Sequence, residues 1–131
     1  MNRIPATITD IKAHNGITVI SFMAMGQPMR MMALEVDDTL EAGSEVVLGV
    51  KASNIALAKN PVGLMSISNR LNATIKHISN GKLLSSIKFR LGDTLIESVI
   101  TLDSSHRMNL QQGDSIIALI KSSELSILEK L

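Results

Sequence analysis

Short runs in which apolar and polar residues alternate predict β-strands along the whole chain, because side chains of a strand point alternately to its two faces. Turn signals separate the runs, the clearest being Asn15-Gly16 and Asn80-Gly81. Two polar segments, residues 35–43 and 103–110, are expected to form short helical turns, the second capped by Asp103. The predicted strands are residues 4–11, 17–25, 29–34, 46–51 and 55–58, followed by 73–78, 83–91, 95–101, 115–121 and 125–128.

The order of these elements is repeated because the sequence itself is repeated. Residues 2–8 read NRIPATI and residues 69–75 read NRLNATI, so five of seven positions are identical. Residues 50–55 read VKASNI and answer to IKSSEL at 120–125. Two matched segments in the same order indicate a tandem duplication. We therefore divide the sequence into residues 1–60, a linker and shared opening segment at 61–68, and residues 69–131.

Five short strands with a helical turn between the third and fourth are typical of a small OB-type barrel. The predicted fold class is all-β, with two tandem OB-type five-stranded Greek-key barrels. SH3-like barrels have a similar element order and remain an alternative. A unit of about 60 residues buries only about 60% of its unfolded surface, so each half is expected to pack on the other or on neighbouring chains.

Composition restricts the function more than it defines it. The net charge of +1 provides no general attraction for polyanions, and the lack of cysteine excludes disulfides and thiolate metal sites. We recognise no secretory signal and no apolar run long enough to span a bilayer, so a cytoplasmic protein without a membrane partner is expected.

No catalytic set is visible, and no enzymatic activity is expected. His14, His77 and His106 have no ligand spacing, and Asp37-Asp38 is typical of a solvated turn rather than an acid–base pair. The methionines of residues 23–32 are expected to fill the core, with a soft-metal site as the alternative. Single-strand nucleic-acid binding is not expected, because Phe22 and Phe89 are the only aromatic residues apart from histidine.

The repeated lysine segments offer a different chemistry. In each, a lysine (Lys51 or Lys121) is followed by small residues that include hydroxyls. A lysine, hydroxyl donors and a turn of consecutive N–H groups can together hold a tetrahedral oxyanion. The alternative is that both lysines simply end strands in solvent.

Residues 66–75, SISNRLNATI, resemble the opening of a Mop domain, the small OB-type molybdate-binding module, which typically reads S-x-R-N-x-L-x-G-x-V. The similarity continues through VITLDS at 99–104, LQQGDSI at 110–116 and ALIKSS at 118–123. It covers all of the second half and, in the first, the opening residues and 40–54. The chain thus resembles a di-Mop molbindin, built from tandem Mop/TOBE domains.

The resemblance implies cytoplasmic binding of molybdate, or tungstate, for storage or homeostasis. It also implies a homo-oligomer, expected to be a trimer, with oxyanion sites between Mop units. The alternative is a ligand-sensing module of a molybdate-responsive regulator or transporter ATPase. The residues that the resemblance assigns to oxyanion binding are Ser66, Ile67, Ser68, Asn69, Thr101, Ser104, Lys121, Ser122 and Ser123, with Lys51, Ala52 and Ser53 in the first half.

This sequence departs from the family pattern in two places. Ser68 stands where the family often has arginine, which removes a fixed positive charge from that wall. In the first half, residues 31–34 read MMAL and carry no hydroxyl, and the opening segment is reduced to Met1 and Asn2. Sites built from first-half elements are therefore expected to be incomplete or fewer.

Overall fold

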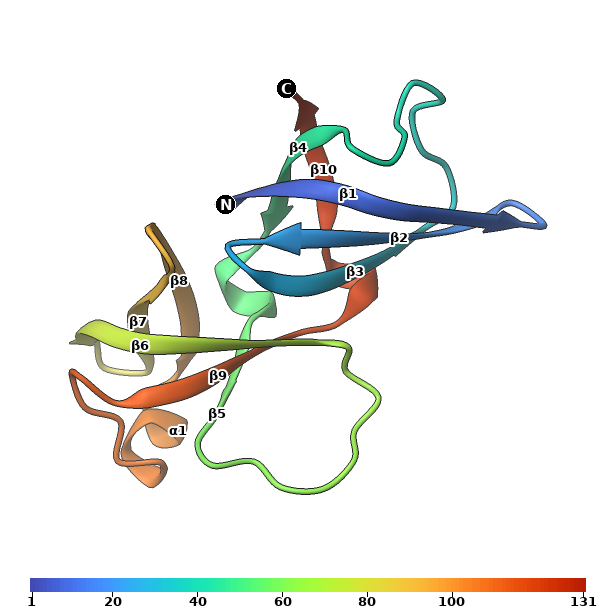
Figure 1. Ribbon diagram of the computed structural model, residues 1–131. Coiled ribbons are helices and arrows are strands. Elements are labelled where there is room, and N and C mark those ends of the chain that lie inside the picture. The colour runs from blue at the N-terminus through green and yellow to red at the C-terminus, as the bar shows by residue number, and fades with distance from the viewer.

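The computed structural model describes all residues from Met1 to Leu131 as two five-stranded antiparallel sheets that lie next to each other (Figure 1). The strand order is β10-β4-β1-β2-β3 in the first sheet and β5-β9-β6-β7-β8 in the second. The predicted all-β class with two five-stranded units is confirmed. The strands are β1 (Asn2–His14), β2 (Ile17–Ala24), β3 (Gln27–Ala33), β4 (Glu45–Val50), β5 (Ala56–Ala58), β6 (Asn69–Asn80), β7 (Leu84–Leu91), β8 (Thr94–Thr101), β9 (Ser115–Ile120) and β10 (Ser126–Lys130).

The first three strands of each half form an equivalent meander. Both opening strands contain a register shift, between Ile8 and Asp10 in β1 and between Ile75 and His77 in β6. The β1–β2 turn has positive φ at Asn15 and Gly16, which is the geometry that an Asn-Gly hairpin turn requires. The repeat seen in the sequence is therefore a repeat of strand geometry, including the bulges, but not of this turn, since Asn80 and Gly81 have no positive φ and Asn80 belongs to β6.

The two halves exchange their last strands. β10, at the C-terminus, pairs with β4 in the first sheet, and β5, from the first half, pairs with β9 in the second. The expectation that residues 55–58 and 125–128 close their own halves is wrong. Short 3₁₀ turns, η1 (Ala52–Asn54) and η2 (Ser122–Glu124), carry the chain from one sheet to the other. Alternation alone cannot reveal such an exchange, because it identifies a strand and not its partner.

One apolar core runs through both units, as expected for halves too small to fold alone. Twenty-five buried residues form a single cluster, including Phe22 from β2 and Phe89 from β7. Of the methionines expected in the core, Met29 and Met31 are buried, whereas Met23 and Met32 are exposed. The exchange and the shared core make the two halves one folded body.

Only one of the two segments predicted to be helical contains a helix. Residues 35–43 form no helix, because Asp37 accepts hydrogen bonds from the backbone N–H and the hydroxyl of Thr39 and holds a local turn. The second segment contains α1 (Leu102–Arg107), but its N-cap is Thr101, not Asp103. The Thr101 hydroxyl accepts a hydrogen bond from the N–H of Ser104.

Candidate functional site

Asn69 lies where three parts of the chain meet. It is fully buried, begins β6 and pairs with Ile120 at the end of β9. Its side chain bonds the backbone of Arg30 in β3 in both directions: Nδ2 donates to the carbonyl at 2.9 Å, and Oδ1 accepts from the N–H at 2.6 Å. These contacts fix the start of β6 against the first sheet, so Ser68 emerges beside β3.

Lys121 leaves the second sheet at the same end. It follows Ile120 directly, and the η2 turn after it packs against β3. The side chains of Lys121 and Ser123 are exposed, and Ser122 is half-buried. The resulting group is called the Lys121 cluster and consists of Arg30, Ser68, Asn69, Lys121, Ser122 and Ser123.

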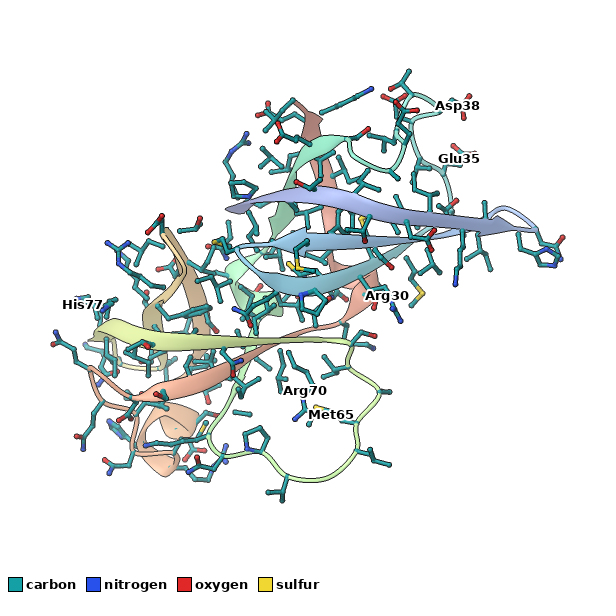
Figure 2. All side chains as sticks on the ribbon, viewed as in Figure 1. Arg30, Glu35, Asp38, Met65, Arg70 and His77 are labelled. Carbon is teal, nitrogen blue, oxygen red and sulfur yellow. The ribbon has the colours of Figure 1, made fainter.

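A surface cavity of about 490 Å³ borders this cluster. Arg30 and Ser68 line it together with the hydroxyl residues Thr9 and Ser21. Figure 2 shows the Arg30 side chain below β3, near the η2 turn and the start of β6. Hydroxyls and a guanidinium therefore line one cavity, and β3, which carries that guanidinium, contacts the turn that follows Lys121.

An equivalent group, called the Lys51 cluster, is formed by Met1, Asn2, Glu97, Lys51, Ala52 and Ser53. Asn2 pairs with Val50 and bonds the backbone of Glu97 in β8, with Nδ2 to the carbonyl at 2.8 Å and Oδ1 to the N–H at 2.9 Å. The η1 turn packs against β8, as η2 packs against β3. The backbone arrangement of the Lys121 cluster is thus present twice.

The side chains of the two clusters differ in charge. Met1 and Glu97 occupy the positions of Ser68 and Arg30, so the Lys51 cluster combines a cation with a carboxylate that accepts a 2.5 Å hydrogen bond from Ser86. Neither Arg30 nor Lys121 belongs to an ion pair, the three in the chain being Arg3–Glu129, Lys59–Asp114 and Arg107–Asp103. The Lys121 cluster is therefore the better match for an anion.

The other residues that the family resemblance assigns to oxyanion binding lie outside the two clusters. Ser66 and Ile67 are in the segment that leads into β6. Thr101 opposes Leu84 at the far end of β8, so it and Ser104 lie at the other end of the second sheet from Asn69. Their hydroxyls bond each other at 2.9 Å, and Arg107 donates to Ser104 Oγ at 3.0 Å. Within one chain, Thr101 and Ser104 therefore belong to neither cluster.

Arg30 was not identified from the sequence. Its counterpart in the repeat is an acidic residue, and it lies within the methionine-rich strand, so neither the repeat nor a basic run identifies it. Only the contact between β3 and the start of β6 reveals its place.

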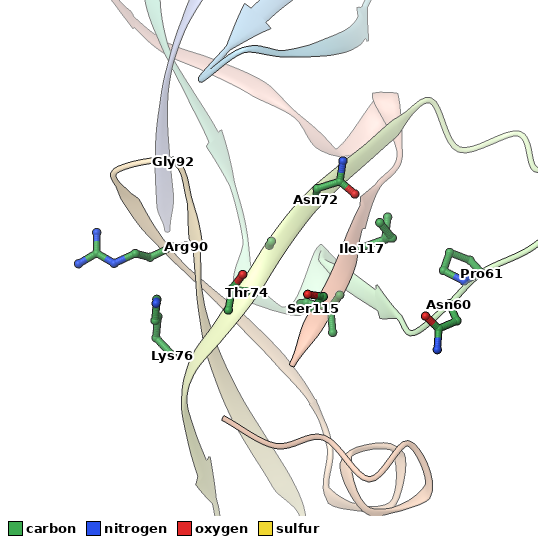
Figure 3. Close-up of a pocket in the computed structure, with 11 residues that line it drawn as sticks. Asn60, Pro61, Asn72, Thr74, Lys76, Arg90, Gly92, Ser115 and Ile117 are labelled. Carbon is green, nitrogen blue, oxygen red and sulfur yellow. The ribbon is translucent and has the colours of Figure 1, made fainter. Parts of the chain in front are cut away.

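A larger cavity of about 560 Å³ lies on the second unit (Figure 3), where Lys76 and Arg90 approach it from β6 and β7. Thr74 and Ser115 supply hydroxyls to the same cavity. This cavity was not predicted from the sequence, where its only signal is the basic residues at outward positions of these strands. It lies on the outer face of β6 and β9, and the lysine turns do not line it.

No group of three or more histidine, aspartate or glutamate side chains is placed to hold a metal ion. None of the helices combines the length and the apolar character needed to cross a membrane.

The chain is similar to a family model and to several known proteins. Residues 65–127 match the model of the TOBE domain. The crystal structure of the cytoplasmic molybdate-binding protein ModG, with molybdate bound, superimposes with a TM-score of 0.90 and 27% identity, over 96% of this chain and 94% of that one. A molybdate-binding protein from Sporomusa ovata is 33% identical with a TM-score of 0.50, over 51% of this chain and 100% of that one.

The molybdenum import ATP-binding protein ModC of Hahella chejuensis is 33% identical over 85 residues, which are 63% of this chain. The match spans about a quarter (24%) of that relative's length. The fold and the two lysine turns define a protein of two OB-type units in tandem. The chain belongs to the Mop (TOBE) domain family, in its di-Mop form.

Proposed function

We propose that this protein binds molybdate, or tungstate, in the cytoplasm for storage or homeostasis. The observation that carries the proposal is the similarity, over 96% of the chain, to a cytoplasmic molybdate-binding protein with molybdate bound. The bound oxyanion would be the ligand, with no organic cofactor and no catalytic step. The Lys121 cluster is the proposed principal site.

The chemistry of the cluster supports an oxyanion. A dianion would accept hydrogen bonds from the serine hydroxyls and from backbone N–H groups at the start of the η2 turn, and Lys121 would add a point charge. Molybdate and sulfate have the same charge and shape, so selection between them would depend on cavity size.

The sites are proposed to be completed between copies of the chain in a homotrimer. Thr101 and Ser104 lie away from both clusters in one chain, so a second copy would have to supply them. Large apolar side chains are exposed on the isolated chain, among them Leu34, Leu64 and Leu83 at 76%, 104% and 80%. Burial of such side chains is the usual driving force for stable association.

Calorimetric titration of the purified protein with molybdate, tungstate, sulfate and phosphate tests the proposal. We expect heats for the first two and weak or no heats for the others. Lys121→Ala should weaken binding, whereas Lys82→Ala, which removes an exposed lysine outside both clusters, should not. Equal or absent heats for all four anions would overturn the proposal, and a monomer by light scattering would overturn sites shared between copies.

A second candidate is a ligand-sensing module. It is supported by the similarity of 85 residues to part of a molybdenum import ATP-binding protein. In that case the chain would act in a regulator or transporter, and a pull-down should recover a stoichiometric DNA-binding or transporter partner. Recovery of the protein only with itself would favour the storage function.

A further inference from the structure

We infer that Arg30 is an anion-binding residue of the Lys121 cluster, and that Glu97, its counterpart in the repeat, makes the Lys51 cluster the weaker site. The inference rests on the proposed function, since it assigns residues within the same oxyanion site. Arg30 lies in β3, outside the opening and lysine segments of the family pattern.

The position of Arg30 is fixed by its own backbone. Its N–H and carbonyl are both bonded to the side chain of buried Asn69, so β3 is held against the start of β6. Ser68 precedes Asn69, and Arg30 and Ser68 line the same cavity of about 490 Å³. A guanidinium from β3 is thus present on the wall where Ser68 itself supplies only a hydroxyl.

Arg30 is also free to bind a ligand. Its side chain is exposed, forms no ion pair and donates no hydrogen bond within the chain. The nearest acidic residue by strand register is Asp10. Asp10 and Arg30 lie on either side of Ser21 and both pair with it, but they form no ion pair with each other. A planar guanidinium with several N–H donors is well suited to two oxygens of a tetrahedral anion.

The repeat provides an internal comparison. Asn2 holds Glu97 by the same pair of backbone hydrogen bonds that joins Asn69 to Arg30. The two clusters therefore have matching backbones but opposite charges at this position. A carboxylate near a bound dianion is repulsive, whereas a guanidinium is attractive. Each chain thus offers one strong site and one weak site.

Calorimetric titration with molybdate of Arg30→Gln, Arg30→Lys and Lys82→Gln tests the role of Arg30. We expect about a tenfold or greater loss of affinity for Arg30→Gln, because a hydrogen bond to a charged group is removed. Arg30→Lys should retain part of the affinity. Lys82→Gln, which removes a positive charge outside both clusters and both cavities, should change the affinity less than about twofold, as expected of a screened exposed charge.

The Arg30 variants are expected to keep the fold, because the hydrogen bonds between Asn69 and Arg30 use the backbone of Arg30. An unchanged melting temperature checks this. Equal affinities for Arg30→Gln and Lys82→Gln would overturn the inference while leaving molybdate binding intact. Absence of binding by the unaltered protein would instead overturn the proposed function.

Glu97→Gln gives an independent measurement. It keeps an acceptor for Ser86 and removes the negative charge from the Lys51 cluster. We expect the affinity of the second, weaker class of binding sites for molybdate to rise several-fold, while the affinity of the strong class stays the same. A variant that leaves the weak class unchanged, or that alters the strong class instead, would overturn the assignment of Glu97.

Discussion

Asn54 and Glu124 are joined by a hydrogen bond of 2.8 Å from Nδ2 to Oε2. Each is the third residue after its lysine, Lys51 or Lys121, so they are equivalent positions of the repeat. The bond therefore connects the two lysine turns directly. Met25 and Gly92, another equivalent pair, also meet: a Cβ built on Gly92 would lie 3.1 Å from that of Met25. Contacts between equivalent residues indicate a pseudo-twofold relation between the halves.

The Asn54–Glu124 bond is expected to couple the two turns weakly. Glu124 is exposed and Asn54 is half-buried, so solvent screens the interaction. A double-mutant cycle of Asn54→Ala and Glu124→Ala, measured by urea unfolding, should give a coupling free energy of about 0.5 kcal/mol. Strict additivity of the two substitutions would show that the turns are not linked in solution.

Ser98→Ala should destabilise the contact between the second sheet and the η1 turn. The buried Ser98 hydroxyl donates to the carbonyl of Ile55 at 2.6 Å. Its loss leaves a buried acceptor without a partner, which costs about 1–3 kcal/mol in the free energy of unfolding. Ser79→Ala, at an exposed strand position, is the matched control, with a change within about 0.5 kcal/mol. Equal effects in urea unfolding would contradict the prediction.

Asp114 should contribute to stability in a pH-dependent manner. The hydrogen bond from Lys59 Nζ, with a second from the N–H of Gln111, lowers the pKa of this carboxyl below 3.8 in the folded state. A lowered folded pKa gives stability that is present above the unfolded pKa and is lost as the pH falls through the folded pKa.

Asp114→Asn should therefore lower the melting temperature at pH 7, and the difference from the unaltered protein should shrink below pH 3.8. Asp38→Asn, at an exposed carboxylate without an ion pair, is the control. A melting-temperature difference for Asp114→Asn that stays constant down to strongly acidic pH would contradict this account.

The repeat allowed the class of fold and most strand positions to be predicted, because alternation and Asn-Gly turns are local signals. The partner of each last strand was not predictable, since β5 and β10 have the same pattern whichever sheet they join. The lysine turns and Asn69 were predicted as site residues from the repeated sequence and the family resemblance. Arg30 was not, because its role depends on a contact between strands of different halves, 39 residues apart. Asp103 was expected to cap α1, but Thr101, two residues earlier, has the hydroxyl that reaches Ser104.

The exchange of β10 can be tested at Gly49 in β4. A Cβ on Gly49 would lie 2.7 Å from Cγ of Leu128, whose side chain covers it from β10. Gly49→Ala should therefore destabilise the protein by about 1–3 kcal/mol, through overpacking rather than backbone strain. Leu128→Ala removes the obstructing atoms, so the double variant should be less destabilised than the sum of the two single variants. Urea unfolding of all four proteins gives this cycle. Additive effects would mean that Leu128 does not lie on Gly49, and hence that β10 does not complete the first sheet in solution.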